Sequence, residues 1–275
     1  MIKYLFLPVL LILTISGYAE SLQDSTKSSY NLFHPCPRDQ LRSFETDRPD
    51  ATESPYTVDA GHFQFETDLF KTDRLSVNGV KTVTNSFNNF NLKAGLTNSL
   101  DIQFISESFV DTRIINGSSP ETGTSFSNIT IRAKQNIWGN DKGRTAMAIL
   151  PFVNIPTVPN VKITGGVVFP FSIALPHDWS CGTQFELDIE DDQAGNGYHI
   201  NPLVSATFSH AIISKINFFT EVLMTRDNEL NRYESFLDAG LVYTWKKNLK
   251  FDAGVYYGLK STSSKVYFIG LSFRH

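Results

Sequence analysis

The stretch Thr46–Pro55, with the sequence TDRPDATESP, brings charged residues and prolines close together. Asp47 and Arg48 are oppositely charged neighbours, and each can pair with an opposite charge elsewhere in the chain. Pro49 and Pro55 restrict the backbone, so the stretch can be ordered without an apolar core of its own. These residue types therefore predict a compact polar turn cluster that forms ion pairs. Its candidate functional residues are Thr46, Asp47, Arg48, Pro49 and Glu53.

The sequence gives much less support for a catalytic or metal-binding set of residues than for this charge pairing. A hydrolase needs a Ser nucleophile, a His base and an orienting polar group. His199 and Asn201 are the nearest candidates, and no Ser is placed by spacing to complete the set. The other His residues are scattered without metal-ligand spacing, and the sequence has neither a Cys-x-x-Cys pair nor a phosphate-binding glycine loop. The sequence therefore predicts no catalytic residue, no metal site and no cofactor.

The N-terminus has the pattern of a secretory signal peptide. Residues 1–19 combine Lys3, an apolar run from Tyr4 to Ile15, and the small-x-small ending Gly17-Tyr18-Ala19. A membrane anchor is the alternative, but a spanning helix needs about 20 apolar residues. We therefore expect cleavage after Ala19 and export of the mature chain.

From Gly61 to the C-terminus, apolar and polar residues alternate in stretches of about ten, which is typical of a transmembrane β-barrel. In Gln184–Glu190, three apolar side chains would lie on one face and only carboxamide and carboxylate groups on the other. A mean hydropathy of −0.15 agrees with this, because residues that face the lumen dilute those that face lipid. We expect an all-β fold, a closed antiparallel transmembrane β-barrel of about 12 strands.

Twelve strand candidates follow one another, an even number as a closed antiparallel barrel of one bacterial chain requires. They are 61–71, 87–96, 100–107, 128–138, 145–154, 163–175, 183–191, 198–209, 216–225, 234–245, 249–258 and 265–273. We expect long outer loops at 72–86, 108–127, 155–162 and 226–233, tight inner turns at 97–99, 139–144 and 246–248, and longer inner turns at 176–182 and 210–215. Since proline removes a donor from the ladder, bulges or rim positions are expected at Pro151, Pro170 and Pro202.

The polar faces of these strands would line the lumen. Their charges have mixed signs, which favours structural ion pairs over a selectivity filter. Strands 145–154 and 163–175 carry apolar residues on both faces, so part of the inner wall packs against the N-terminal segment or lines a path for an apolar solute. The predicted lumen residues are Glu66, Lys93, Asp101, Arg132, Lys134, Glu186, Asp188 and Glu221.

TDRPDATESP, followed by the Gly61–Glu66 sequence GHFQFE, closely resembles the opening of a transporter-like family of outer-membrane proteins named for the MetA pathway of phenol degradation. The resemblance runs from about residue 44 onward. It implies an outer-membrane β-barrel that moves small, often apolar or aromatic, compounds, and it brings no catalytic site. Further matching segments are Ile131–Lys134, Ile155–Thr157, Leu175–Trp179 and Ile269–Arg274.

We therefore divide the chain into a signal peptide (1–19), a polar N-terminal segment that is periplasmic or a plug (20–59), and a barrel (60–275). As a plug, the segment would place Arg48 against an acidic wall residue such as Glu66 or Glu221. The alternative is a periplasmic lead-in that caps the barrel mouth.

Two further expectations follow from this topology. Cys36 and Cys181 would both lie on the periplasmic side, where an oxidising environment would join them in a disulfide. The last strand, with Phe273 near the terminus, resembles the signal that barrels present to the barrel-assembly machinery.

The sequence predicts a passive channel or transporter-like conduit for small, apolar or aromatic solutes. The expected partners are outer-membrane lipid, the assembly machinery and a small-molecule solute. A net charge of −4 argues against nucleic acid. The alternatives are a non-conducting structural or adhesion barrel and, third, an outer-membrane lipid-modifying enzyme.

Overall fold

The computed structural model describes residues 27–116, 119–125, 128–158, 161–192 and 197–275. The predicted signal peptide lies outside the described residues. Strands make up most of the described chain, together with two short 3₁₀ helices, η2 (Lys27–Ser29) and η3 (Arg38–Gln40). Among the described residues, no helix has the length and apolar character needed to cross a membrane.

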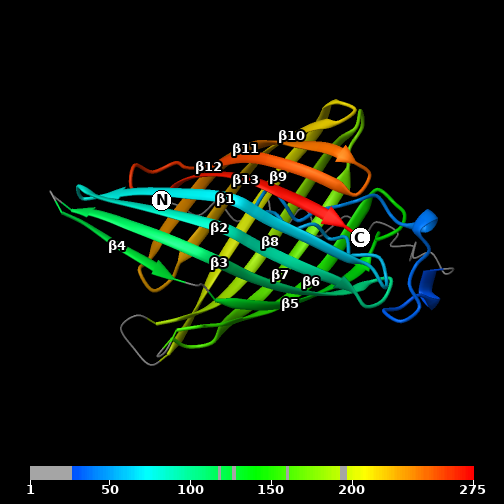
Figure 1. Cartoon of the computed structure of the whole chain (residues 1–275), viewed down its shortest axis with the longest axis horizontal. Helices are drawn as coiled ribbons and strands as arrows, with labels where there is room; N and C mark the ends of the chain where they lie inside the picture. Colours follow the sequence, from blue (N-terminus) through cyan, green and yellow to red (C-terminus); the bar gives the residue numbers. More distant parts are fainter. Residues whose placement is uncertain (1–26, 117–118, 126–127, 159–160, 193–196) are drawn as a thin grey trace, which may run out of the picture.

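The strands form one closed antiparallel barrel (Figure 1). Neighbours in sequence pair with each other, except that β5 pairs with β3 and not with β4, and the first strand pairs with the last to close the wall. β4 pairs with β3 alone among the described residues, so the wall itself has 12 strands and the predicted fold is confirmed. The strands are β1 (Phe63–Val77), β2 (Val80–Gly95), β3 (Leu100–Asn116), β4 (Ser119–Ser125), β5 (Ile129–Trp138), β6 (Thr145–Ile155), β7 (Thr164–Ala174), β8 (Trp179–Asp191), β9 (Tyr198–Ile213), β10 (Ile216–Asp227), β11 (Arg232–Lys246), β12 (Leu249–Gly258) and β13 (Lys265–Arg274).

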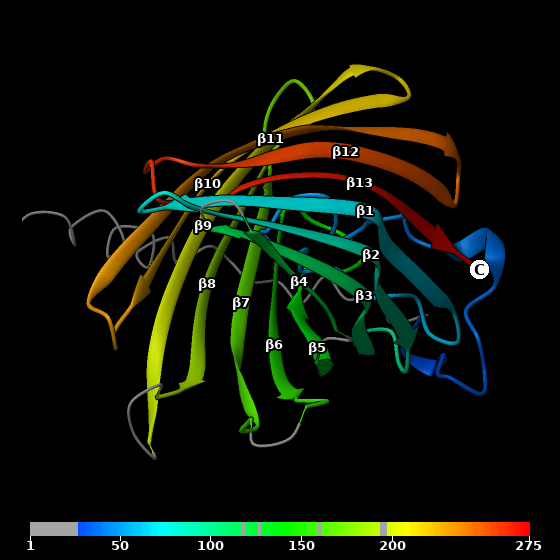
Figure 2. The same cartoon turned by 60° about the vertical axis from the view of Figure 1, so that its left-hand side comes forward.

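The two ends of the barrel differ. We call the end that carries the N-terminal segment the proximal end, and the end that carries the β1–β2 hairpin tip the distal end (Figures 1 and 2). At the distal end, the expected loops 72–86 and 108–127 are wrong. The first is a continuation of β1 and β2 through the two-residue turn Asn78–Gly79, where both residues have positive φ, and most of the second belongs to β3 and β4. These extensions are rich in polar residues, and apolar residues such as Leu75, Val77 and Val80 gather only next to the turn, so the sequence lacks the sustained alternation that marks a lipid-facing strand.

The outer face of the wall is apolar, as a lipid environment requires. On β8, Phe185 and Ile189 are 43% and 46% exposed, whereas Gln184 on the opposite face is buried. A water-soluble protein rarely exposes large contiguous apolar surface, but a bilayer solvates it. Other exposed apolar residues on the strands include Phe63, Leu92, Ile102, Phe104, Ile131, Val204, Leu237 and Ile269.

The prolines in the wall do not produce the expected bulges. The β5–β6 ladder has no pairs between Arg132↔Phe152 and Gln135↔Ile149, next to Pro151, yet its register is unchanged. The β6–β7 ladder is likewise interrupted opposite Pro170, and Pro202 pairs in register with Leu187. At Pro151 and Pro170 the ladder therefore has a gap and no extra residue, and at Pro202 it has neither. Register shifts occur elsewhere, between Asp68 and Phe70, Asn136 and Trp138, Ile216 and Asn217, and Thr244 and Lys246.

The predicted disulfide is wrong, because Cys36 and Cys181 are both free. Cys36 is buried at the proximal end, where its N–H donates to the carbonyl of Ala60. Cys181 lies within β8 and not in a turn, since β8 begins at Trp179. By strand alternation Cys181 shares the outer face with Phe185. The wall therefore separates Cys181 from the segment that carries Cys36.

Candidate functional site

The segment Thr46–Thr57, which we call the lumenal segment, enters the barrel from the proximal end and returns to it (Figure 2). It bonds to inward-facing side chains around the wall. Its contacts reach β1, β2, β5, β8, β9, β10 and β12. Most of the partners are charged. The strand alternation explains this, because residues that point inward are the polar set of each strand.

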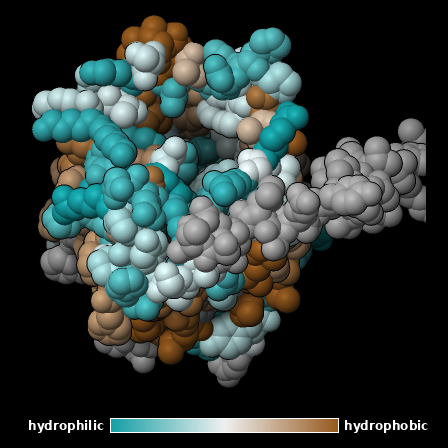
Figure 3. Space-filling model, turned by 90° about the vertical axis from the view of Figure 1, so that its right-hand side faces the viewer, coloured by the Kyte–Doolittle hydropathy of each residue, from teal (hydrophilic) through white to brown (hydrophobic). Residues whose placement is uncertain are grey.

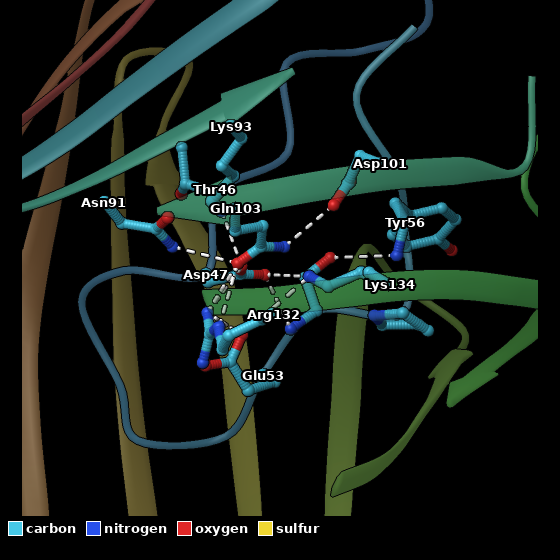
Figure 4. A network of polar contacts seen from close by, with 12 residues as sticks. Thr46, Asp47, Glu53, Tyr56, Asn91, Lys93, Asp101, Gln103, Arg132 and Lys134 are labelled. Atoms are coloured by element: carbon cyan, nitrogen blue, oxygen red, sulfur yellow. Dashed lines mark hydrogen bonds and ion pairs between the residues drawn. The ribbon is translucent and has the colours of Figure 1, made fainter. Parts of the chain in front are cut away.

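Asp47 is the centre of the first group of contacts (Figure 4). Its carboxylate lies 2.5 Å from Nζ of Lys93 on β2 and 2.6 Å from Nζ of Lys134 on β5, and Arg132 is 3.7 Å away. Burial opposes ionisation of Asp47, but Lys134 and Lys93 outweigh it and hold its pKa well below the usual range. We call Lys93, Arg132 and Lys134 the cationic wall.

Glu53 binds the same wall from the other end of the lumenal segment. Its carboxylate lies 2.5 Å from Nη1 of Arg132, and its backbone N–H donates to Oε1 of Gln184 on β8 at 2.7 Å. Gln103 on β3 orients Arg132 by accepting from its Nη2 at 2.7 Å. Asp101 on the same strand accepts from the N–H of Val58 at 3.0 Å and so fixes the exit of the segment.

Glu66 on β1 receives the backbone of the segment. It accepts hydrogen bonds from the N–H groups of Asp47 and Arg48, both at 3.1 Å, and it also contacts Lys93. Glu66 is 1% exposed, and its carboxylate is shared between the segment and the wall residues Lys93 and Gln64. It is a partner of Arg48 through the backbone alone.

The side chain of Arg48 has different partners from those predicted. Its Nη1 lies 2.5 Å from Asp68 on β1 and its Nη2 lies 2.6 Å from Asp252 on β12. The expected side-chain pairing with Glu66 or Glu221 is therefore wrong. Strand register explains the difference, because Asp68 and Asp252 both pair with Gly270 on β13 and so form one row across three strands. Next along the chain, the carbonyl of Pro49 accepts from Tyr256 Oη at 2.5 Å.

Glu221 on β10 holds the middle of the segment through neutral donors. Its two oxygens accept from the N–H groups of Ala51 and Thr52, each at 2.8 Å, and the Thr52 hydroxyl also contacts it. Asp238 pairs with Glu221 across β10 and β11 and is 1% exposed, and neither of its oxygens has a hydrogen-bond partner among the described residues. We call Glu221 and Asp238 the acidic wall.

Asp50 lies on the part of the segment that faces the acidic wall. Burial, followed by the charge of Glu221, raises the pKa of Asp50 to about 8. No base forms an ion pair with Asp50, Glu221 or Asp238 among the described residues, which is the opposite of the situation at Asp47.

Glu186 and Asp188 lie on the inner face of β8 and form no ion pair with a base among the residues that the structure describes. Gln184 connects Glu186 to the segment, because its Nε2 donates to Glu186 at 2.6 Å while its Oε1 accepts from Glu53. Lys93, Asp101, Arg132, Lys134 and Glu221 are thus gathered around the segment, whereas the β8 acids extend from it toward the distal end.

The apolar inner wall is packed and not open. Ala146, Ala148 and Leu150 on β6 are 0% exposed, and Val168 on β7 is 2% exposed. Tyr56 of the segment lies against this region, with its hydroxyl 3.4 Å from Ser172 Oγ on β7. These strands were expected either to pack against the N-terminal segment or to line a path for an apolar solute. The burial of their inward side chains agrees with packing.

Several residues of the site were missed from sequence. Asp68, Asp252, Tyr256, Gln103 and Gln184 all bond to the segment or orient its partners. Their inward direction is readable from alternation, but their selection from among other inward polar residues depends on register. At the proximal end a further network ties the chain leading to the segment to the mouth of the barrel, and hydrophilic residues gather on this face (Figure 3). It consists of Lys27, Arg42, Asp59, Asp141 and Arg274.

No group of three or more His, Cys, Asp or Glu residues in the described part of the chain could hold a metal ion. The site is thus a set of charge pairs and hydrogen bonds between a segment and the wall around it. Fold and site together define an outer-membrane type of β-barrel whose lumen contains its own N-terminal segment.

The family follows from the sequence of the same region. Residues 46–274 match the model of the family described as "Putative MetA-pathway of phenol degradation", and the chain belongs to this family. The match begins at the first residue of the lumenal segment. No curated protein sequence matches the chain.

Two solved structures illustrate the fold. The COG4313 outer membrane channel from Pseudomonas putida F1 is similar over 84% of this chain and 99% of its own, with 10% sequence identity and a TM-score of 0.56. The NanC porin is similar over 76% of this chain and 98% of its own, with 11% identity and a TM-score of 0.51. At these identities the likeness concerns the fold alone.

Proposed function

We propose that this protein is a passive outer-membrane conduit for small, apolar or aromatic molecules, and that the lumenal segment is its plug. In this proposal residues 1–19 direct export, residues 20–59 form the lead-in and plug, and residues 60–275 form the conducting barrel. The solute class is suggested by the name of the family, which refers to phenol degradation.

The observation that carries the proposal is that a separate segment occupies the lumen. An eight-stranded barrel is filled by its own wall side chains, and a barrel of 12 strands encloses more space. Here the space is taken by Thr46–Thr57, which is bound by side chains of the wall and is not itself a strand. A filling that is joined to the barrel by charge pairs can leave it without breaking the wall.

The test is solute passage with and without the plug. Deleting residues 20–55 should leave a folded, heat-modifiable barrel and should raise single-channel conductance and the liposome-swelling rate with phenol. Wild-type protein is the reference, and deletion of the Asn78–Gly79 turn region at the distal end is the control for an unspecific change in the barrel. If the barrel inserts and remains closed after the deletion, the conduit proposal is wrong and a non-conducting structural barrel is supported.

A further inference from the structure

The surroundings of Arg48 form a built pocket. Asp68, Gly270 and Asp252 are in register on β1, β13 and β12, so that a carboxylate stands on each side of a glycine. The guanidinium lies over that glycine. A Cβ at position 270 would come within 2.1 Å of Arg48 Nη2, so the absence of a side chain lets the planar group lie directly against the strand.

An aromatic ring completes the pocket. The Cζ of Arg48 lies 5.6 Å from the ring centroid of Phe268, which is 4% exposed, and Tyr256 packs on that ring at a centroid distance of 5.0 Å. Two carboxylates and an aromatic face recognise organic cations, because the ring quadrupole and the acids attract the same charge. The side chains of Arg48 and Asp68 remain 16% and 13% exposed, so one side of the pocket is open.

We propose that this pocket is a binding site for organic cations, in which Arg48 is the built-in occupant. The ligand class is a small apolar or aromatic body that carries an amidinium, guanidinium or ammonium group. The inference rests on the proposed function in one respect, since a conduit is what would bring such a solute to the lumen.

The charge of the surroundings selects this class over others. With Arg48 bound, the two carboxylates of the pocket still exceed the single positive charge, and Glu221 on β10, which forms no ion pair with a base among the described residues, adds a further acid to the same lumen. Such a surface raises the local concentration of cations and repels anions. A neutral aromatic compound would gain the ring contact without the charge pairing.

The backbone of Arg48 is held separately from its side chain. Its N–H donates to Glu66, and its carbonyl accepts from Thr46 Oγ1 at 2.8 Å. The guanidinium can therefore leave the pocket while the lumenal segment stays in place. Exchange of the occupant does not require removal of the plug.

The experiment measures binding of benzamidinium and its neutral analogue benzamide to full-length protein in detergent, by equilibrium dialysis. Arg48→Ala removes the competitor, so this variant should bind benzamidinium at least about tenfold more tightly than wild type, with no such gain for benzamide. Adding Asp252→Asn should reverse the gain by about tenfold or more. Adding Gly270→Ala should also reverse it, while both carboxylates remain.

Arg232→Ala is the matched control, because Arg232 is 58% exposed at the distal end. It should bind benzamidinium as wild type does. The inference is overturned if Arg48→Ala shows no preference for benzamidinium over benzamide, or if the added Asp252→Asn and Gly270→Ala changes have no effect. Binding without conductance in any variant would refute the conduit and leave the pocket, whereas conductance without binding would do the reverse.

Discussion

The cationic wall and the acidic wall hold the same segment by opposite means. At the cationic wall, the segment supplies the carboxylates of Asp47 and Glu53 to bases on the barrel. At the acidic wall, the barrel supplies Glu221 to backbone N–H groups of the segment, and no base takes part among the described residues. The first attachment is a set of ion pairs and the second a carboxylate bound by neutral donors. The two attachments should therefore respond differently to mutation and to pH.

The largest effect is expected at the cationic wall. Asp47→Ala leaves Lys93 and Lys134, which are 2% and 0% exposed, without their shared partner. Removing one member of a buried ion pair typically costs about 3–5 kcal/mol. We expect the segment to undock, which would be measured as rapid tryptic cleavage at Arg42, just before the segment, in detergent-solubilised protein. Asp39→Ala, on the exposed helix η3, is the control and should remain as protected as wild type.

A smaller effect is expected at the acidic wall. Glu221→Gln keeps an acceptor oxygen for the segment but removes the charge that strengthens its bonds to Ala51 and Thr52. The loss should be about 1–2 kcal/mol, below that of Asp47→Ala. The same tryptic assay measures it, with Glu234→Gln near the distal end as the control. If Asp47→Ala and Glu221→Gln lose the same docking free energy, the ion pairs and the hydrogen bonds from neutral donors hold the segment equally strongly, and the expected order of effects is wrong.

The pH dependence should come from the acidic wall. Asp50 has its pKa raised to about 8 in the docked segment, by burial and by Glu221. Docking therefore favours the protonated form, and it weakens as pH rises from the ordinary range of a free carboxyl toward 8. The pKa of Asp47 is lowered, so its contribution is lost only in strong acid. We expect conductance of wild type to increase between about pH 4 and 8, and Asp50→Asn should abolish the increase. If the conductance of Asp50→Asn still rises with pH, another titrating group causes the rise.

The smallest effect on docking of the segment is expected from the cysteines, because noncovalent contacts alone hold the segment in the barrel. Cys181→Ser changes a side chain on the outer face of β8, so tryptic protection of the segment should stay as in wild type. Labelling of unfolded, unreduced wild type should find two thiols. Loss of protection in Cys181→Ser, or the absence of both thiols, would restore a covalent tie.

Much of the barrel could be predicted from the sequence, because the alternation of apolar and polar residues indicates which side chains face lipid. The strands around Phe185 and Ile131 are examples. The distal hairpin at Asn78–Gly79 could not be predicted in this way, since polar residues such as Thr82 and Thr84 interrupt its apolar face and the alternation is not sustained.

The candidate site was predictable in kind but not in partners. Alternation places Glu66, Lys93 and Lys134 inside the barrel. Whether Arg48 meets Glu66 or Asp68 depends on the stagger between β1 and β13, including the register shift after Asp68, which no local pattern encodes. The position of Cys181 was wrong for a similar reason, because the start of β8 at Trp179 is set by pairing with β7 and β9.

The row formed by Asp68, Gly270 and Asp252 also bears on biogenesis. β1 and β13 are the two ends of the wall, so their pairing has the longest sequence separation of any ladder and is slow to form by chance encounter. Arg48 bridges β1 and β12 directly across this seam. A segment bound inside the nascent sheet would hold both edges at the correct stagger, and the same residues would then act as an internal template for closure. Pulse-chase conversion of Arg48→Ala to the heat-modifiable form should accordingly be slower than that of wild type, even where the final barrels are equally stable.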